Sequence, residues 1–216
     1  MKVKIKSTWD EITWKEYEQI EQVLTTDIPS DYKAVHLVSL LTGLAVEDIE
    51  CLPITEFQKF IPVLEFLQTE PVTRTHQFEY TVNGREYVFR GQLNDITTAQ
   101  YVDYSTYMKD DNKDVVKLFS CFLIPKDHEY NDGYNMGQVW SDIGDMCWLD
   151  VRAAAFFFRI QLAAYTLILK SSLKRTMKKA KAKKPEIKQM EESLDSMVYS
   201  LLYSGCVNAE TPNLTE

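Results

Sequence analysis

Residues 151–169 read VRAAAFFFRIQLAAYTLIL and contain neither proline nor glycine. The run is rich in helix formers, and its bulky side chains would fall on nearly every side of a helix. It therefore predicts one long helix, buried on most of its circumference, around which the rest of the chain packs. A membrane span needs about 20 apolar residues. However, Arg152 and Arg159 lie inside this run and a central arginine costs roughly 3 kcal/mol, so we expect a core helix and no contact with a membrane.

Length and composition indicate a protein with a substantial hydrophobic core. The 216 residues are 45% hydrophobic, which fits one domain of moderate size with an appendage. The four cysteines are scattered without a Cys-x-x-Cys pair, which is typical of reduced thiols in a cytosolic protein. The charged residues 1–11 precede no apolar stretch, so we expect no secretory signal and a protein that is made and used without export.

The formal net charge of −8 hides a strong asymmetry along the chain. Residues 170–188 hold nine lysines and arginines and one acidic residue, Glu186, a net +8 that leaves −16 on the rest of the chain. An acidic body with a basic arm favours contacts between copies, because the arm of one copy can bind the body of another. The alternative is a solvated helix face. We divide the chain into a helical domain with a hairpin, residues 1–170, and a basic helical arm with a loose C-terminal tail, residues 171–216.

The clearest local prediction is a β-hairpin at residues 76–90. Asn83-Gly84 separates two alternating runs, and the two-residue turn that this pair favours requires positive φ at both positions. Such a loop fixes the pairing of the strands and puts four aromatic side chains on one face. A lone hairpin is barely stable in water, so this face must pack on the helices or on a neighbouring chain. We expect all four aromatics to be mostly buried, with the pairs Val82 and Arg85, Tyr80 and Tyr87, and Phe78 and Phe89.

The remaining patterns predict helices separated by short turns. Thr13 and Glu16 have the spacing of a capping box that opens a helix over 14–24. Pro62 should kink the apolar helix that follows Pro53, or mark its first turn. The fold class is therefore α+β and mostly α-helical: a multi-helix domain with one small antiparallel β-hairpin and a long C-terminal helical arm. The other expected elements are an edge strand at 3–6 and helices over 34–42, 46–49, 98–108 (capped by Asp95 or Thr97), 115–124, 139–149 and 187–203.

The residues that could carry chemistry do not form a convincing set. Residues 127–133, DHEYNDG, resemble a calcium loop, but the sixth place, which needs glycine, is Asp132 and the twelfth, which needs glutamate, is Gln138. The cysteines and histidines lack the short spacings of a zinc site. The sequence contains neither a glycine-rich phosphate loop nor a nucleophile elbow. We therefore expect no enzyme activity, no cofactor and no metal.

The basic arm has three candidate partners: nucleic acid, a membrane and another protein. Several lysines on one segment are the footprint of nonspecific nucleic-acid binding, but no aromatic residue is interleaved with them to stack on bases, and the body is acidic. A basic helix can lie on a membrane, but Leu173, Met177 and Ala180 form a poor apolar face. A protein partner fits the arm better than the other two.

Five segments of the chain form a recognisable pattern. They are 8–17 (TWDEITWKEY), 40–44 (LLTGL), 82–88 (VNGREYV), 96–104 (ITTAQYVDY) and 156–158 (FFF). In this order they resemble small structural-module proteins of crAss-like phages, the tailed bacteriophages that infect gut Bacteroidetes, over roughly residues 1–170. The segments are folding motifs rather than catalytic ones. The resemblance implies a connector or tail-ring subunit of the virion, or a factor that helps to build the tail without staying in it.

We therefore expect a non-enzymatic virion structural protein, a ring-forming subunit of the neck or tail near the head–tail connector, assembled in the cytoplasm of the bacterial host. Its expected partners are copies of itself in a ring and adjacent neck and tail proteins. The alternatives are a cytosolic tail-assembly chaperone that is not retained in the virion, and a nucleic-acid-binding protein packaged with the genome. In the arm, lysines should give orientation and rate, and apolar residues should give affinity. The predicted partner-binding residues are Lys174, Arg175, Lys178, Lys179, Lys181, Leu194, Met197, Leu201 and Leu202.

Overall fold

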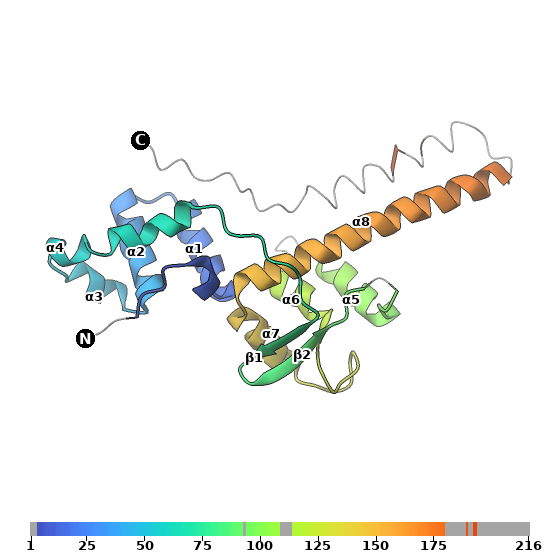
Figure 1. The fold of residues 1–216 in the computed structure, drawn as a ribbon, viewed down its shortest axis with the longest axis horizontal. Coiled ribbons are helices and arrows are strands. Elements are labelled where there is room, and N and C mark those ends of the chain that lie inside the picture. Colours follow the sequence, from blue (N-terminus) through green and yellow to red (C-terminus); the bar gives the residue numbers. More distant parts are fainter. Residues whose placement is uncertain (1–3, 93, 109–113, 180–188, 190–191, 194–216) are drawn as a thin grey trace.

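The computed structural model describes residues 4–92, 94–108, 114–179, 189 and 192–193, and 60% of it is helical (Figure 1). A small three-stranded antiparallel sheet and a long C-terminal helix complete the fold. This architecture confirms the expected α+β class. Of the helix expected over 187–203, the structure describes residues 189 and 192–193 alone.

A group of helices forms the N-terminal part, and local sequence sets their ends. α1 (Trp14–Thr25) begins with the expected capping box, in which the Glu16 N–H donates to Thr13 Oγ1 (3.3 Å) and the Thr13 N–H donates to the Glu16 carboxylate (3.0 Å). α2 (Ser30–Thr42) ends at Gly43, whose φ of 70° is the left-handed conformation of a helix C-cap. The other elements here are η1 (Trp9–Glu11), α3 (Val46–Glu50), α4 (Ile54–Phe57) and η2 (Ile61–Gln68).

The stretch after Pro53 and the residues at 4–6 were both expected to form regular elements. The apolar stretch after Pro53 forms the short α4 and then the 3₁₀ helix η2, with Pro62 in its first turn, because proline cannot donate to the preceding turn. The expected edge strand at 3–6 is wrong, since residues 4–6 form no strand. The Lys6 N–H instead donates to the carbonyl of Leu41 (3.1 Å), which attaches this segment to the end of α2.

The sheet contains one strand more than expected. β1 (Glu79–Val82) and β2 (Arg85–Phe89) form the hairpin, and β3 (Leu123–Pro125) pairs antiparallel with β2. The expected helix over 115–124 is therefore wrong in its second half, because α6 (Val115–Ser120) ends before the strand. Leu123 and Ile124 are buried and lie opposite Phe89 and Val88. A short apolar run fits a buried strand as well as a buried helix, so periodicity could not choose between them.

The hairpin turn has the geometry that its sequence predicts. Asn83 and Gly84 have φ values of 51° and 75°. Three of the four aromatic side chains are buried, but Phe78 precedes β1 and is 42% exposed, so the expectation of burial is wrong there. The register is confirmed, with Val82 opposite Arg85 and Tyr80 opposite Tyr87.

The long helix α8 (Trp148–Lys179) organises the arrangement of the other elements. α5 (Thr98–Tyr107) begins at Thr97, which forms a second capping box, and α7 (Met136–Asp145) leads into α8. In Figure 1 the N-terminal helices lie at one end of the molecule, and the sheet with α5, α6 and α7 lies along the near half of α8. The far half of α8 extends beyond this body.

Gly84→Val should destabilise the protein by about 2 kcal/mol, because a β-branched residue resists the positive φ of this position. A Cβ built at Gly84 meets nothing within 4 Å apart from its chain neighbours, so the effect would come from the backbone and not from a clash. Gly84→Asn is the matched control, since asparagine tolerates this conformation. Urea unfolding measures both variants. A valine variant as stable as the parent would show that the turn assignment is wrong.

Candidate interaction surface

The start of α8 is fixed to the N-terminal helices by Trp148. Its indole stacks on the ring of Tyr17, with centroids 4.3 Å apart and an interplanar angle of 4°, and the ring of Trp9 meets it edge-on at 5.2 Å. The backbone N–H of Trp148 donates to the carbonyl of Ile12 (3.0 Å). Because Trp148 is buried, these aromatic contacts hold the first turn of α8 inside the core.

Arg74 reinforces the same junction. Its Nη1 donates to Asp150 in the first turn of α8 (2.8 Å), and its Nη2 donates to Asp10 in η1. The hydrogen bond to Asp150 raises the pKa of Arg74 and outweighs the opposite effect of burial. The segment between η2 and β1 is thereby tied to both η1 and α8.

The next turns of α8 pack on the sheet and on α5. Phe157 stacks on His76 with ring centroids 4.4 Å apart. Phe158 contacts Phe122 at 4.2 Å and Tyr104 of α5 at 5.0 Å. The body therefore holds α8 firmly through Phe158, and Leu162, one turn further on, still packs against the same core.

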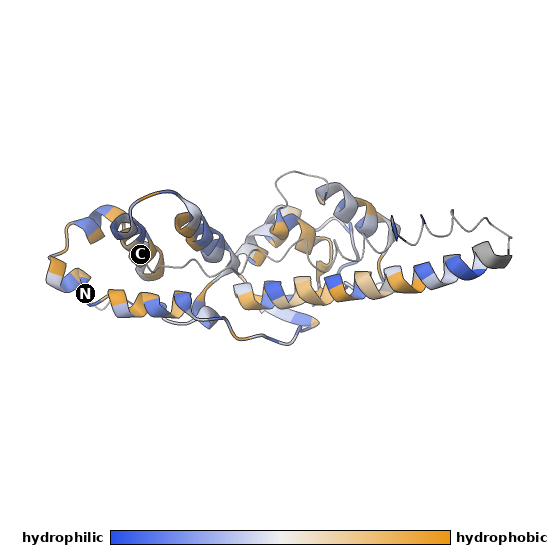
Figure 2. Ribbon diagram, turned by 90° about the horizontal axis from the view of Figure 1, so that it is seen from above, coloured by the Kyte–Doolittle hydropathy of each residue, from blue (hydrophilic) through white to orange (hydrophobic). Residues whose placement is uncertain are grey.

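A row of exposed apolar side chains begins beside these contacts and continues along α8 beyond them. Phe156 is 58% exposed, Ile160 46%, Leu167 49% and Ile168 65%. At 3.6 residues per turn, their spacing puts all four within about one third of the helix circumference. Figure 2 shows hydrophobic residues continuing along α8 where it leaves the body. We call these four residues the α8 face.

The α8 face contradicts the expectation that residues 151–169 are buried on most of their circumference. α8 has 32 residues. At 1.5 Å per residue it is about 48 Å long, longer than the stretch that the body covers. Ala163 and Thr166 are buried, so part of the far half is covered while the α8 face is not. A helix that is apolar all round normally lies in an interior, which is why the sequence assigned these residues to the core.

The structure describes few of the predicted partner-binding residues. Lys174 and Arg175 lie exposed on α8, within two turns of Ile168. These two basic residues therefore lie next to the α8 face, which the sequence pattern had placed in the core and not in a contact with a partner. Lys178 and Lys179 belong to the last described turn of α8, where their side chains are not described. Outside the described residues lie Lys181, Leu194, Met197, Leu201 and Leu202.

By length and composition alone, α8 could also cross a membrane between Trp148 and Thr176. Within its most apolar stretch, 25% of the residues are buried in the protein. The core helix of a soluble protein has the same length and composition, so this finding does not by itself distinguish the two environments.

The densest polar network in the body surrounds Asp142 of α7, whose side chain is buried. Asn83 Nδ2 donates to this carboxylate (2.9 Å), as does Gln138 Nε2 (3.1 Å). Arg85 Nη1 donates to both of its oxygens (2.9 and 2.6 Å), and the Tyr87 hydroxyl donates to one of them. Asn83, Arg85 and Tyr87 belong to the hairpin and attach it to α7, whereas Gln138 lies on α7 itself, one turn before Asp142.

The Asp142 network has the character of a structural anchor. Burial raises the pKa of Asp142, but the hydrogen bonds from Tyr87, Asn83, Arg85 and Gln138 together outweigh burial and hold it below its usual 3.8. Burial and the Asp142 carboxylate raise the pKa of Tyr87, so its hydroxyl stays protonated and keeps donating. With four donors on one carboxylate, little capacity remains to bind a ligand.

His76 is a partly buried titratable group that packs against α8. Burial lowers its pKa to about 4, so the ring is neutral at pH 7. Nδ1 pairs with the Tyr80 hydroxyl (3.1 Å), while Nε2 is buried without a hydrogen-bond partner. The ring lies among Phe78, Phe89 and Phe157. A neutral imidazole enclosed by aromatic rings serves packing.

The loop at 127–133 forms a turn with no cluster of metal ligands. Asn131 and Gly133 have φ values of 63° and 75°, which is typical of a tight turn. His128 Nδ1 and Asp132 Oδ2 lie 3.6 Å apart. Nowhere in the described part of the chain do three or more His, Cys, Asp or Glu side chains form a group that could hold a metal ion.

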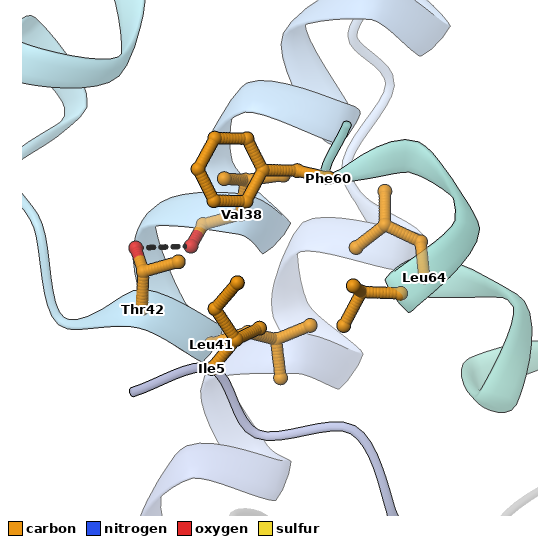
Figure 3. Close-up of a pocket in the computed structure, with 7 residues that line it drawn as sticks. Ile5, Val38, Leu41, Thr42, Phe60 and Leu64 are labelled. Carbon is orange, nitrogen blue, oxygen red and sulfur yellow. Dashed lines mark hydrogen bonds between the residues drawn. The ribbon is translucent and has the colours of Figure 1, made fainter. Parts of the chain in front are cut away.

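A small apolar hollow lies between α2 and η2 (Figure 3). It has essentially no room for a water molecule, whereas small-molecule sites enclose roughly 300–1,000 Å³. The hydroxyl of Thr42 already donates to the Val38 carbonyl (2.6 Å). The hollow is therefore a packing gap, lined by Ile5, Val38, Leu41, Thr42, Phe60, Val63 and Leu64.

The chain matches no protein-family model, no curated protein and no solved structure. The α8 face is the strongest candidate functional surface of the described residues, because it combines exposed apolar side chains with adjacent positive charge.

Asp142→Asn should lower the free energy of unfolding at pH 7 by about 2–3 kcal/mol, because it deprives buried donors of their charged acceptor. The folded-state pKa of Asp142 lies below the unfolded value, so its contribution is present above about pH 4 and is lost as the pH falls through the folded-state pKa. The difference between parent and variant should therefore shrink in urea unfolding below pH 4.

Asp145→Asn is the matched control for this experiment. Asp145 is exposed on the same helix and accepts one hydrogen bond from Asn83 (2.9 Å). Its substitution should change the unfolding free energy by less than about 0.5 kcal/mol. Equal losses at the two positions would refute the role given to the buried carboxylate.

Proposed function

We propose that this protein is a non-enzymatic structural subunit of a tailed-bacteriophage particle. In this proposal it forms a ring in the neck or tail, near the head–tail connector, and packs against copies of itself and adjacent neck and tail proteins. The α8 face carries the proposal, because it offers apolar side chains on a helix that extends beyond the body. The resemblance of residues 1–170 to structural-module proteins of crAss-like phages supplies the biological setting.

The part of the α8 face next to the body suits a contact between subunits. Contiguous exposed apolar side chains mark interaction sites, since water around them is released when a partner covers them. Burying one large apolar side chain completely contributes about 1.5–3 kcal/mol. Phe156 and Ile160 are each about half exposed, so the pair adds a useful fraction of that in every contact around a ring. The basic residues beyond them favour an acidic neighbour, as the body of another copy would be.

A tail-assembly chaperone is the second candidate, because the same α8 face could cover an apolar surface of another phage protein. A ring subunit stays in the particle, whereas a chaperone leaves it. Mass spectrometry of purified particles and of infected cells separates the two. Stoichiometric recovery from particles supports the ring subunit, and recovery from cells alone supports the chaperone.

A chain truncated before Lys174 should fold and yet fail to enter rings or particles. The residues of α8 that pack against the core cluster reach Leu162, and the buried Ala163 and Thr166 also precede Lys174, so removing the arm leaves them in place. Circular dichroism and thermal unfolding test the fold, and particle incorporation tests assembly. An unfolded product would assign the arm to the core, and normal incorporation would refute the assembly role.

A double substitution tests the α8 face directly. Phe156→Glu with Ile160→Glu should leave the fold intact and reduce incorporation into rings at least tenfold, because two charges would have to be desolvated in the contact. The control is Tyr101→Glu with Val102→Glu on α5, where the side chains are equally exposed, at 58% and 54%. Loss of incorporation in both variants, or in neither, would argue against a specific role of α8.

A further inference from the structure

We propose that the far half of α8 is covered by residues 187–203 of the same chain, which fold back as an antiparallel helix and make the arm a two-helix hairpin. The inference concerns the free protein and goes beyond its place in a phage particle. It starts from Leu167 and Ile168, which are exposed on a helix that has already left the body. These residues need an apolar partner, and the chain itself supplies one within reach.

The length of the connection favours the same chain. The described part of α8 reaches Lys179, and the amphipathic pattern of the sequence resumes at Ile187, so seven residues, 180–186, lie between the two. Connections of roughly two to eight residues commonly join antiparallel helices. A 17-residue helix over 187–203 is about 25 Å long and would reach back along α8 to about Ala163. It would therefore cover Leu167 and Ile168 and leave Phe156 and Ile160 to another partner.

The charges of the two segments are complementary in this register. Folding back about the middle of the connection sets Glu191 near Arg175 and Val198 near Ile168. The acidic residues of the segment, Glu191, Glu192 and Asp195, then lie beside the turns of α8 that carry Lys170, Lys174 and Arg175. Its apolar residues recur at spacings of three and four, which puts one stripe toward α8: Met190, Leu194, Met197, Val198 and Leu201.

A second copy of α8 fits the far half less well. In an antiparallel pair of α8 helices centred on the α8 face, Arg152 of one copy would lie near Lys174 of the other, at both ends of the contact. Like charges at such positions oppose pairing. The tethered segment also competes at an effective concentration in the millimolar range, which a separate chain seldom reaches.

A membrane also fits less well than the tethered segment. The body holds α8 as far as Leu162, so the part that is left to enter a bilayer extends from Ala163 to Thr176. These 14 residues span about 21 Å, well below a hydrocarbon core of about 30 Å. They also include Lys170, Lys174 and Arg175, which are costly in that environment.

Distance measurement between two spin labels tests the fold-back in the full-length protein. Ser172→Cys and Ser193→Cys are both at exposed positions. The background is Cys51→Ser, Cys147→Ala and Cys206→Ser; Cys121 can stay, because burial raises the pKa of its thiol to about 12 and keeps it unreactive. Helices packed 8–10 Å apart should give a label distance of about 20 Å. An arm that continued as one helix would give about 30 Å or more.

Dilution with unlabelled protein identifies the chain that supplies the helix. A short distance that persists at tenfold dilution supports the fold-back. A short distance that disappears on dilution would assign the helix to a second copy and overturn the proposal. A long distance in buffer, whether or not lipid vesicles with anionic headgroups shorten it, would overturn it as well.

Charge reversal checks the register without relying on burial. Lys174→Glu with Arg175→Glu, or Glu191→Lys with Glu192→Lys, should at least halve the population with the short distance. Combining the two pairs should restore it, because opposite charges face each other again. Failure of the combined variant to recover, with each pair alone showing the loss, would refute the proposed pairing.

Discussion

The rest of the structure depends on how α8 is fixed at its first turn. The Trp14 N–H donates to the Met146 carbonyl (2.8 Å) and the Trp148 N–H to the Ile12 carbonyl (3.0 Å), so the chain on both sides of this junction is held by backbone hydrogen bonds. The stack of Trp148 on Tyr17 adds a contact that also orients the helix. An α-helix is stiff, so fixing its first turns sets the direction of the remainder. The far half consequently leaves the body however apolar its side chains are.

The body is assembled around the first half of α8 through contacts of two kinds. Aromatic packing joins α8 to the sheet and to α5, through Phe157 on His76 and Phe158 on Phe122. Directional hydrogen bonds join the hairpin to α7, through the buried carboxylate of Asp142. The apolar contacts contribute most of the burial, and the polar network sets the position of the hairpin. Few of these contacts extend past Phe158, which separates a folded body from an arm with a surface of its own.

Features encoded by neighbouring residues could be predicted from the sequence, and features that depend on distant pairing could not. The capping box at Thr13 and the positive φ at Asn83 and Gly84 follow from side-chain chemistry within a few residues, so their prediction is confirmed. β3 exists because Leu123 and Ile124 reach the free edge of β2, more than 30 residues away in sequence, and local periodicity carries no information about that edge. The exposed face of α8 was missed for a related reason: apolar composition indicates that a side chain will be covered, but not by which chain.

The composition of the far half of α8 is understandable if one helix serves two contacts. A helix that packs against nothing has little stability in water. The exposure of the Leu167 and Ile168 side chains to water also costs free energy. The basic residues that follow them keep the arm soluble, but they cannot remove the free-energy cost of exposing these apolar side chains. A second amphipathic helix that covers Leu167 and Ile168 removes this cost and stiffens the arm. Phe156 and Ile160, which lie closer to the body, remain accessible to a neighbouring subunit. A single run of apolar residues can thus be divided, with its far part used within the chain and its near part between chains.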